Sequence, residues 1–286
     1  PRGYGGFTGM GFRGRLPVLV DSDDWEGDGG WNRVGSYSLA QRRVFNWQEQ
    51  TLLREADGVS AASSLLYHRA RTIRRRTGYA DSSVLRLPNG LPLDWFDALA
   101  ADGPVDDHTT ATIVIYSRFA EFASDWLPRF LPALDRQSSR PVRVRLIGTD
   151  ESHSGYSNVA VESLGYLRRE QLPSALAAAH LAVIPHDDSL VGRSKHSVKL
   201  LELMAAGCPI VTSDVGDAAD ITGAAAVRVA SNDPALMAHT ALRLLTAPDR
   251  LRQLADAGRA RVQSHYLIPA TAGRLLRWYR EMRVVE

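Results

Sequence analysis

The chain has 286 residues, 44% of them hydrophobic, which is enough to bury a sizeable core in two domains or one large one. Its 34 basic residues nearly balance its 32 acidic ones, so the net charge of +2 excludes a global attraction to nucleic acid. The single cysteine, Cys208, excludes an internal disulfide framework and a multi-thiolate metal site, as expected for a cytoplasmic protein. No apolar run is long enough to predict a transmembrane helix.

In chain order, short apolar runs alternate with helical patterns. We expect strands at residues 16–20, 112–116, 142–147, 181–184 and 209–212. Helices are expected at residues 126–134, interrupted by prolines, and at residues 172–179, 198–206 and 234–245. Most of the strands are too apolar for a solvated face. The alternation therefore predicts an α/β fold in which helices cover parallel sheets.

A polar segment with Gly and Pro at residues 101–108 has no helical or strand period and is expected to be a linker. We predict three parts: an N-terminal domain with the linker at 1–106, a C-terminal domain at 107–265, and a terminal helix at 266–286. Residues 1–90 hold two or three strands, too few for a complete doubly wound domain. Because the chain also starts without Met or a signal-peptide core, we expect it to be N-terminally truncated.

Two motifs carry little weight. Residues 9–14 match G-x-G-x-x-G, but the strand follows this loop instead of preceding it, which argues against a dinucleotide site. The basic stretch at residues 69–76 is expected to be a solvated helix end, where Arg complements the helix dipole. The alternative is a surface that contacts an acidic acceptor or the inner face of an anionic membrane. The histidines show no metal-ligand spacing, so we expect no metal site.

The informative segment covers residues 194–216. A helix that starts after a loop exposes backbone N–H groups and a positive dipole end, and both suit a phosphate. Ser197, Val198 and Lys199 occupy this first turn. Glu202 follows one turn later, where its carboxylate can accept hydrogen bonds from the vicinal hydroxyls of a ribose. Taken alone, Glu202 is better explained as a charged position on an amphipathic helix.

It does not stand alone, because residues 199–212 resemble the donor-binding helix and following strand of glycosyltransferase family 4 (group 1). Segments at 56–63, 88–90, 116–118, 146–148 and 164–167 support the resemblance and follow the family's order. The resemblance implies a GT-B fold with two Rossmann-like domains, the N-terminal one incomplete here. It also implies a nucleotide-sugar donor held mainly by the C-terminal domain, with transfer commonly retaining the anomeric configuration.

The family's roles carry over residue by residue. Glu202 matches the glutamate that holds the ribose, and Arg118 matches the arginine that faces the diphosphate. Gly165 and Tyr166 fall where the backbone and a neighbouring side chain meet the base. Residues 197–199 match the turn whose amides approach the phosphate and the sugar. Cations and amides at the phosphates imply that no metal or other cofactor is required.

Three departures limit the resemblance. Ser194 stands eight positions before Glu202, where many members carry a glutamate that contacts the sugar. The lysine that often follows the arginine is absent after Arg118, and we expect Lys199, Arg193 or Lys195 to compensate.

A histidine often found late in the N-terminal domain is replaced within residues 21–26. We expect Asp23 to take its place, and Asp23 and Asp24 are our candidates for orienting an acceptor hydroxyl. Two other functions stay open at this point: a nucleotide-sugar epimerase of the same fold, and a nonenzymatic nucleotide-sugar-binding fragment. The residues do not identify the acceptor.

Overall fold

The computed structural model describes residues 11, 16–100, 110–119, 121–230 and 232–282. The chain forms two compact units. Unit 1 contains residues 1–89, 188–196 and 269–286, and unit 2 contains residues 90–187 and 197–268. The predicted boundary at residues 106 and 107 lies outside the described residues and stays a prediction. The same holds for the G-x-G-x-x-G motif, of which Gly11 alone is described.

Unit 2 is built on a six-stranded sheet with the order β6-β5-β4-β7-β8-β9, in which every neighbouring pair is parallel. The strands are β4 (Ala111–Tyr116), β5 (Val142–Ile147), β6 (Val159–Ser163), β7 (Leu181–Ile184), β8 (Ile210–Ser213) and β9 (Ala226–Val229). All carboxyl ends therefore meet at one edge of the sheet. The predicted α/β class with parallel strands is confirmed.

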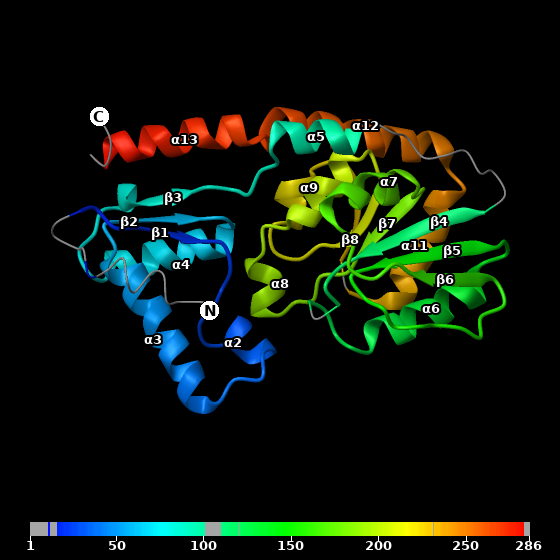
Figure 1. Cartoon of the computed structure of the whole chain (residues 1–286), viewed down its shortest axis with the longest axis horizontal. Helices are drawn as coiled ribbons and strands as arrows, with labels where there is room; N and C mark the ends of the chain where they lie inside the picture. Colours follow the sequence, from blue (N-terminus) through cyan, green and yellow to red (C-terminus); the bar gives the residue numbers. More distant parts are fainter. Residues whose placement is uncertain (1–10, 12–15, 101–109, 120, 231, 283–286) are drawn as a thin grey trace. The chain divides into compact units, whose positions relative to one another are not determined.

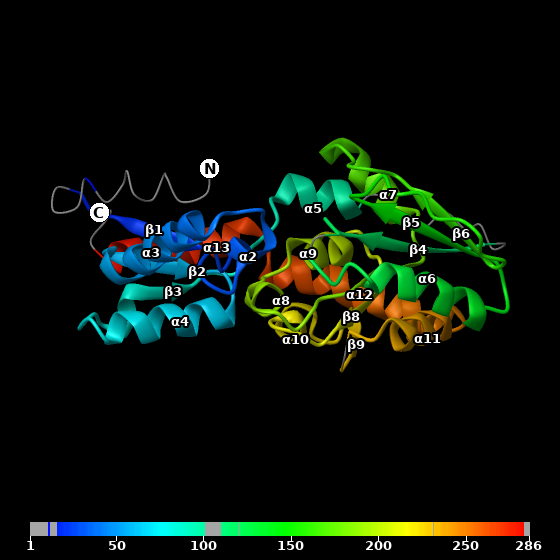
Figure 2. The same cartoon turned by 90° about the horizontal axis from the view of Figure 1, so that it is seen from below.

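Helices cover both faces of this sheet (Figures 1 and 2). Successive residues of β4 point to opposite faces, so Val114 belongs to one buried cluster while Ile113 and Ile115 belong to another. The Val114 cluster is completed by helices α5 (Leu93–Ala100), α7 (Leu172–Ala177), α9 (Val198–Ala205) and α12 (Pro248–His265). The other is completed by α6 (Trp126–Gln137) and α11 (Pro234–Leu245). The short helices η2 (Arg169–Gln171) and α10 (Ala218–Thr222) complete unit 2.

Helix α6 corrects one expectation. We expected its prolines to interrupt the helix, but α6 runs to Gln137 with Pro132 inside it. Proline lacks one N–H donor, which costs a single hydrogen bond of the helix ladder. The buried side chains of Trp126, Phe130 and Leu134 hold the helix on the sheet. Tertiary packing here outweighs the local preference.

Unit 1 contains a parallel sheet of β1 (Leu19–Ser22), β2 (Gly58–Ala61) and β3 (Val84–Arg86). Its helices are α2 (Trp31–Val34), α3 (Leu39–Glu55), α4 (Ser64–Arg75), η1 (Asp81–Ser83), α8 (Leu190–Ser194) and α13 (Ile268–Glu281). Figure 1 shows α4 and α13 on opposite sides of the strands. The first strand begins three residues later than expected, because Val18 is held by Asp57 in a bond outside the sheet ladder.

The basic stretch at residues 69–76 is not a freely solvated helix end. Arg74 is 1% exposed and donates to the carbonyl oxygens of Leu53, Ala56 and Asp57 and to the hydroxyl of Ser83. A guanidinium offers five donors in a rigid fork, which suits this cluster of acceptors.

Three further arginines of the stretch are paired within unit 1. Arg69 forms a salt bridge with Glu49, and Arg71 and Arg75 both pair with Asp81. These two arginines lower the pKa of the Asp81 carboxyl, chiefly through hydrogen bonds. Arg69 therefore links α4 to α3, and Arg71 and Arg75 link α4 to η1.

Candidate functional site at the carboxyl edge of the unit 2 sheet

The strand order of unit 2 reverses between β4 and β7. From β4 the chain moves outward to β5 and β6, and it then returns to β7 and continues to β8 and β9 on the other side. Ligands of open parallel sheets bind in the crevice outside the carboxyl ends of the strands, at such a switch point. Arg118 follows β4, and α9 begins after the segment that follows β7. Two of the predicted donor-binding elements therefore flank the switch point.

Arg118 is held on a strained loop. It is exposed, and the next residue, Phe119, has a φ of 56° in the left-handed region, which is rare for a residue with a side chain. The N–H of Phe119 donates to the hydroxyl of Ser117 at 3.2 Å. Below this loop, Gly148 has a φ of 105°, and its hypothetical Cβ would lie closer than 3.0 Å to the carbonyl oxygen of Ser117. Glycine at 148 is therefore needed for the loop that presents Arg118.

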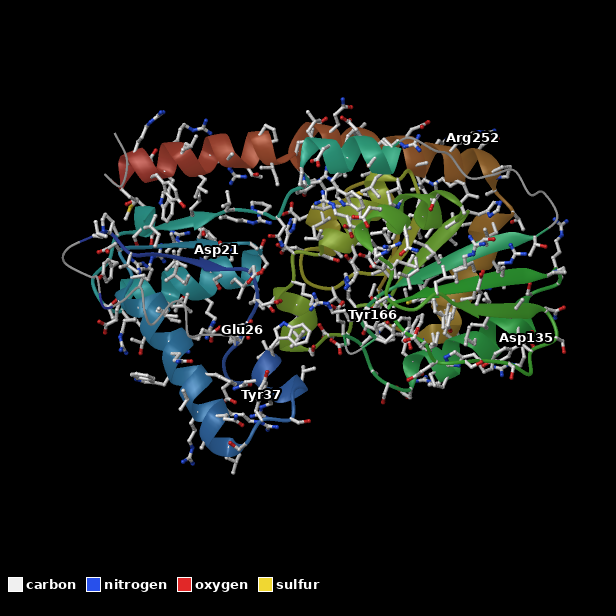
Figure 3. The ribbon with its side chains drawn as sticks, viewed as in Figure 1. Asp21, Glu26, Tyr37, Asp135, Tyr166 and Arg252 are labelled. Atoms are coloured by element: carbon white, nitrogen blue, oxygen red, sulfur yellow. The ribbon has the colours of Figure 1, made fainter. Side chains whose placement is uncertain are left out.

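The base-side loop is tied to the same edge. The N–H of Gly148 donates to the carbonyl oxygen of Gly165 at 2.7 Å, and the N–H of Gly165 donates to Thr149 at 3.1 Å. Gly165 is buried with a φ of 63°, whereas Tyr166 is 73% exposed (Figure 3). The loops after β4, β5 and β6 thus form one hydrogen-bonded group, and Tyr166 offers a free aromatic face beside it.

Helix α9 presents its N-terminus at this edge. Ser197 is the N-cap, and its side chain makes no capping hydrogen bond to the helix in the described structure. The first N–H groups of α9 are therefore not capped by this hydroxyl, and the positive end of the helix dipole adds to them. Val198 is partly exposed on this turn. The arrangement suits an anion, and the donor-binding role of residues 197–199 stays a prediction.

The carboxylate of Glu202 is held in place by two side chains from other elements. The indole Nε1 of Trp95 in α5 donates to Glu202 Oε1 at 3.0 Å, and Tyr116 in β4 interacts electrostatically with the same carboxylate. Burial raises the pKa of the Glu202 carboxyl, and the interactions with Trp95 and Tyr116, together with the positive charges of Lys199 and Arg169, oppose the rise. Burial and the neighbouring Glu202 raise the pKa of Tyr116.

The ammonium group of Lys199 is paired with a carboxylate within unit 2. Its Nζ forms a salt bridge with Glu121 Oε2 at 2.8 Å, and the side chains of the two are 18% and 8% exposed. The ammonium also lies 5.8 Å from the ring centre of Tyr116. The lysine that we expected to compensate for the missing family lysine is thus paired with a carboxylate from the loop after β4.

The other departures have structural counterparts in unit 1. Ser194 is fully buried, and its hydroxyl donates to the carbonyl oxygen of Val191 at 3.2 Å, so it does not replace an outward-facing glutamate. Arg193 forms two hydrogen bonds with Asp188, both of 2.6 Å. Lys195 lies over the ring of Trp31 at 4.9 Å. Each of the three cations that we named as substitutes therefore has a partner within the chain.

Asp23 and Asp24 lie after β1, at the carboxyl edge of the unit 1 sheet. They belong to unit 1, whereas all seven predicted donor-binding residues belong to unit 2. Their role in orienting an acceptor stays a prediction. Sequence reasoning did not single out Asp21, which accepts a hydrogen bond of 2.5 Å from the hydroxyl of Ser60 in β2. Asp21 is exposed, but the neighbouring protein atoms partly desolvate its carboxyl and raise its pKa; the bond from Ser60 opposes this rise, and the charge of Asp23 adds to it.

This shift predicts a stability change. Because the folded-state pKa of Asp21 is raised, its ionisation costs stability as the pH rises through that pKa, and this cost vanishes below the unfolded value. Asp21→Asn keeps the acceptor for Ser60 and should raise the free energy of unfolding by about 0.5 kcal/mol at pH 7, a figure reduced for solvent screening. Urea unfolding should show no gain near pH 3. A gain of the same size at both pH values would contradict this origin.

Among the described residues, no helix is long and apolar enough to cross a membrane. In the same part of the chain, no group of three or more His, Cys, Asp or Glu side chains could hold a metal ion.

Comparison with known proteins gives one match to a family model and several structures of similar fold. Residues 110–247 match the family model described as glycosyl transferases group 1. No curated protein sequence matches the chain.

Three solved structures illustrate the structural likeness. Sucrose-phosphate synthase from Thermosynechococcus elongatus is similar with a TM-score of 0.69 and 20% identity, over 98% of this chain and 72% of that one. HepE from Anabaena, in complex with UDP-glucose, has a TM-score of 0.65 and 15% identity, over 97% and 75%. The α,α-trehalose 6-phosphate synthase from Burkholderia multivorans has a TM-score of 0.62 and 12% identity, over 86% and 64%. At these identities the likeness shows a shared fold.

Proposed function

From the premise that residues 110–247 are a group 1 glycosyl transferase domain, we propose that this GT-B glycosyltransferase moves a sugar from a nucleotide sugar to an acceptor hydroxyl with retention. The observation that carries the proposal is the carboxyl edge of the unit 2 sheet. There the loop of Arg118, the base-side loop of Gly165 and the start of α9 meet at one parallel edge, inside the matched domain. Assignment to family 4 and a cytoplasmic location remain predictions.

Each predicted residue has a role that suits its surroundings. Arg118 is exposed and permanently charged, so it can face a diphosphate. The first N–H groups of α9 add a second source of positive potential. Glu202 keeps acceptor capacity for the ribose hydroxyls, because an ionised carboxylate has about four lone-pair sites and the indole N–H of Trp95 uses one of them. Tyr166 offers its ring to the base.

In the reaction, the bond between the anomeric carbon and the diphosphate oxygen breaks, and the acceptor oxygen bonds to the same carbon on the same face. Negative charge develops on the departing nucleoside diphosphate. Arg118 and the α9 amides are the groups that we propose to stabilise this charge, a form of electrostatic catalysis in which cationic side chains and amides take the place of a metal. We propose that Asp23 or Asp24 orients the acceptor hydroxyl.

The test is calorimetric titration of the wild-type chain and Glu202→Ala with UDP, ADP, GDP, CDP and UDP-glucose. We choose UDP-glucose because it is bound in the HepE structure. One nucleotide should bind, and Glu202→Ala should weaken it by about 30-fold, the effect expected from losing charged hydrogen bonds to two hydroxyls. Glu162→Ala is the control, since this half-exposed glutamate of β6 pairs with Arg145. A folded chain that binds none of these ligands, or a Glu202→Ala variant that binds like wild type, would overturn the proposal.

A further inference from the structure

Glu202 is fixed by residues that lie far from it in the sequence. Trp95 is 107 positions away, 7% exposed, and donates its indole N–H to Glu202 Oε1 at 3.0 Å. Tyr116 ends β4 and interacts electrostatically with the same carboxylate. The two residues come from two elements other than α9. The hydrogen bond from Trp95 restricts rotation of the carboxylate about its last side-chain bond, and Tyr116 is the second residue that acts on it.

The ring of Trp95 also packs against a cationic side chain. The guanidinium of Arg169 lies 4.6 Å from the centre of the Trp95 ring, a cation–π distance. Arg169 in turn lies 3.8 Å from Asp94, the residue before Trp95. Since Arg169 follows the base-side loop of Gly165 and Tyr166, this packing connects the predicted base contact to the predicted ribose contact.

The fixed orientation determines what Glu202 can bind. About four lone-pair sites are available on the carboxylate, and the indole N–H of Trp95 uses one of them. The sites left over suit two donors held close together, such as the 2′- and 3′-hydroxyls of a ribose. A buried acceptor that loses one of its intended donors pays a desolvation cost, and this is how polar sites reject analogues that lack a hydroxyl.

We propose that Trp95 and Tyr116 are positioning residues that fix the Glu202 carboxylate and thereby set the preference of the donor site for ribonucleotides over 2′-deoxyribonucleotides. The inference rests on the proposed function, because it takes Glu202 as the ribose contact.

The same geometry predicts how affinity changes with pH. The charged or titratable groups that face Glu202 are Lys199 on α9, Tyr116 on β4 and Arg169 on η2, while Arg118 and Glu121 act on Tyr116. Burial raises the pKa of Glu202, and the bond from Trp95 is the first of the effects that oppose the rise. Removing this bond therefore raises the pKa further. The ionised carboxylate is the form that accepts hydrogen bonds from the ribose hydroxyls. As the solution is acidified, a variant without the Trp95 bond should therefore lose nucleotide affinity at a higher pH than wild type does.

The experiment uses whichever of UDP, ADP, GDP and CDP binds most tightly, together with its 2′-deoxy analogue. Wild type, Trp95→Phe and Tyr116→Phe are titrated by calorimetry between pH 5 and pH 8. Trp95→Phe keeps an aromatic ring under Arg169 but removes the N–H donor. Trp126→Phe is the matched control, because Trp126 is buried in the other core cluster of unit 2 and its indole N–H has no hydrogen-bond partner in the described structure.

In Trp95→Phe the ratio of ribonucleotide to deoxynucleotide affinity should fall about fivefold at pH 7, the size of one hydrogen bond, and the midpoint of acid loss should move upward. Tyr116→Phe should change the ratio in the same direction, and it carries the test if circular dichroism shows that Trp95→Phe is unfolded. A general packing defect would weaken both ligands equally and leave their ratio unchanged.

Two outcomes separate this inference from the proposed function. If wild type prefers the ribonucleotide, and Glu202→Ala loses that preference while Trp95→Phe and Tyr116→Phe keep it, the inference is wrong and the proposed function stands. If no nucleoside diphosphate binds the folded wild-type chain, the proposed function fails and the inference fails with it.

Discussion

Gly148→Ala should lower the free energy of unfolding by about 3–4 kcal/mol, combining left-handed backbone strain with a steric clash. Gly148 has a φ of 105°, and a Cβ there would lie closer than 3.0 Å to the carbonyl oxygen of Ser117. A backbone atom cannot turn aside as a long side chain can, so the loops after β4 and β5 must separate. The separation would also displace Arg118, and nucleoside diphosphate binding should be lost along with the stability.

Gly155→Ala is the matched control. Gly155 also has a positive φ, of 90°, but no described heavy atom lies within 4 Å of its hypothetical Cβ. This variant carries the backbone strain without the clash and should lose only about 1 kcal/mol. Urea unfolding of both variants, followed by titration with UDP, measures the difference. Equal losses for the two variants would show that the contact between the β4 and β5 loops is not what requires glycine at 148.

The central strands of unit 2 could be predicted from sequence, whereas its edge strands could not. Strands β4, β7 and β8 are buried on both faces and appear as unbroken apolar runs. Strand β6, Val-Ala-Val-Glu-Ser, and strand β9, Ala-Val-Arg-Val, lie at the two edges and carry polar residues. Edge strands contact a neighbour on one side only, so a short polar sequence is sufficient there and gives a weak signal.

The candidate site also has parts that could be predicted from the sequence and parts that could not. The start of α9 and the glutamate one turn later form a local pattern that a sequence can display. The bond between Trp95 and Glu202 joins residues 107 positions apart, and the salt bridge between Lys199 and Glu121 joins residues 78 apart. No local period predicts such pairs, because they depend on how the strand order brings distant loops to one edge. Arg74 is a similar case, because nothing in the run of basic residues around it distinguishes this buried arginine from its neighbours.

The salt bridge between Lys199 and Glu121 provides the last prediction, because both side chains are largely buried. Lys199→Met leaves the Glu121 carboxylate buried without its cation and should lower the free energy of unfolding by about 3 kcal/mol. In the double variant Lys199→Met with Glu121→Leu, two apolar side chains replace the pair, and most of this loss should be recovered. Urea unfolding of the four proteins gives the coupling free energy, which should be about 2 kcal/mol.

Although breaking the salt bridge should cost stability, Glu121→Gln should increase the affinity for a nucleotide. The amide still accepts a hydrogen bond from Lys199 but no longer neutralises the ammonium, so more positive potential reaches the start of α9. A nucleoside diphosphate should then bind about threefold to tenfold more tightly, and the gain should shrink as salt screens the added charge. Weaker binding by Glu121→Gln would contradict this prediction. It would mean that Glu121 holds Lys199 in position for the phosphate, and that neutralising the positive charge of Lys199 is not its main effect on binding.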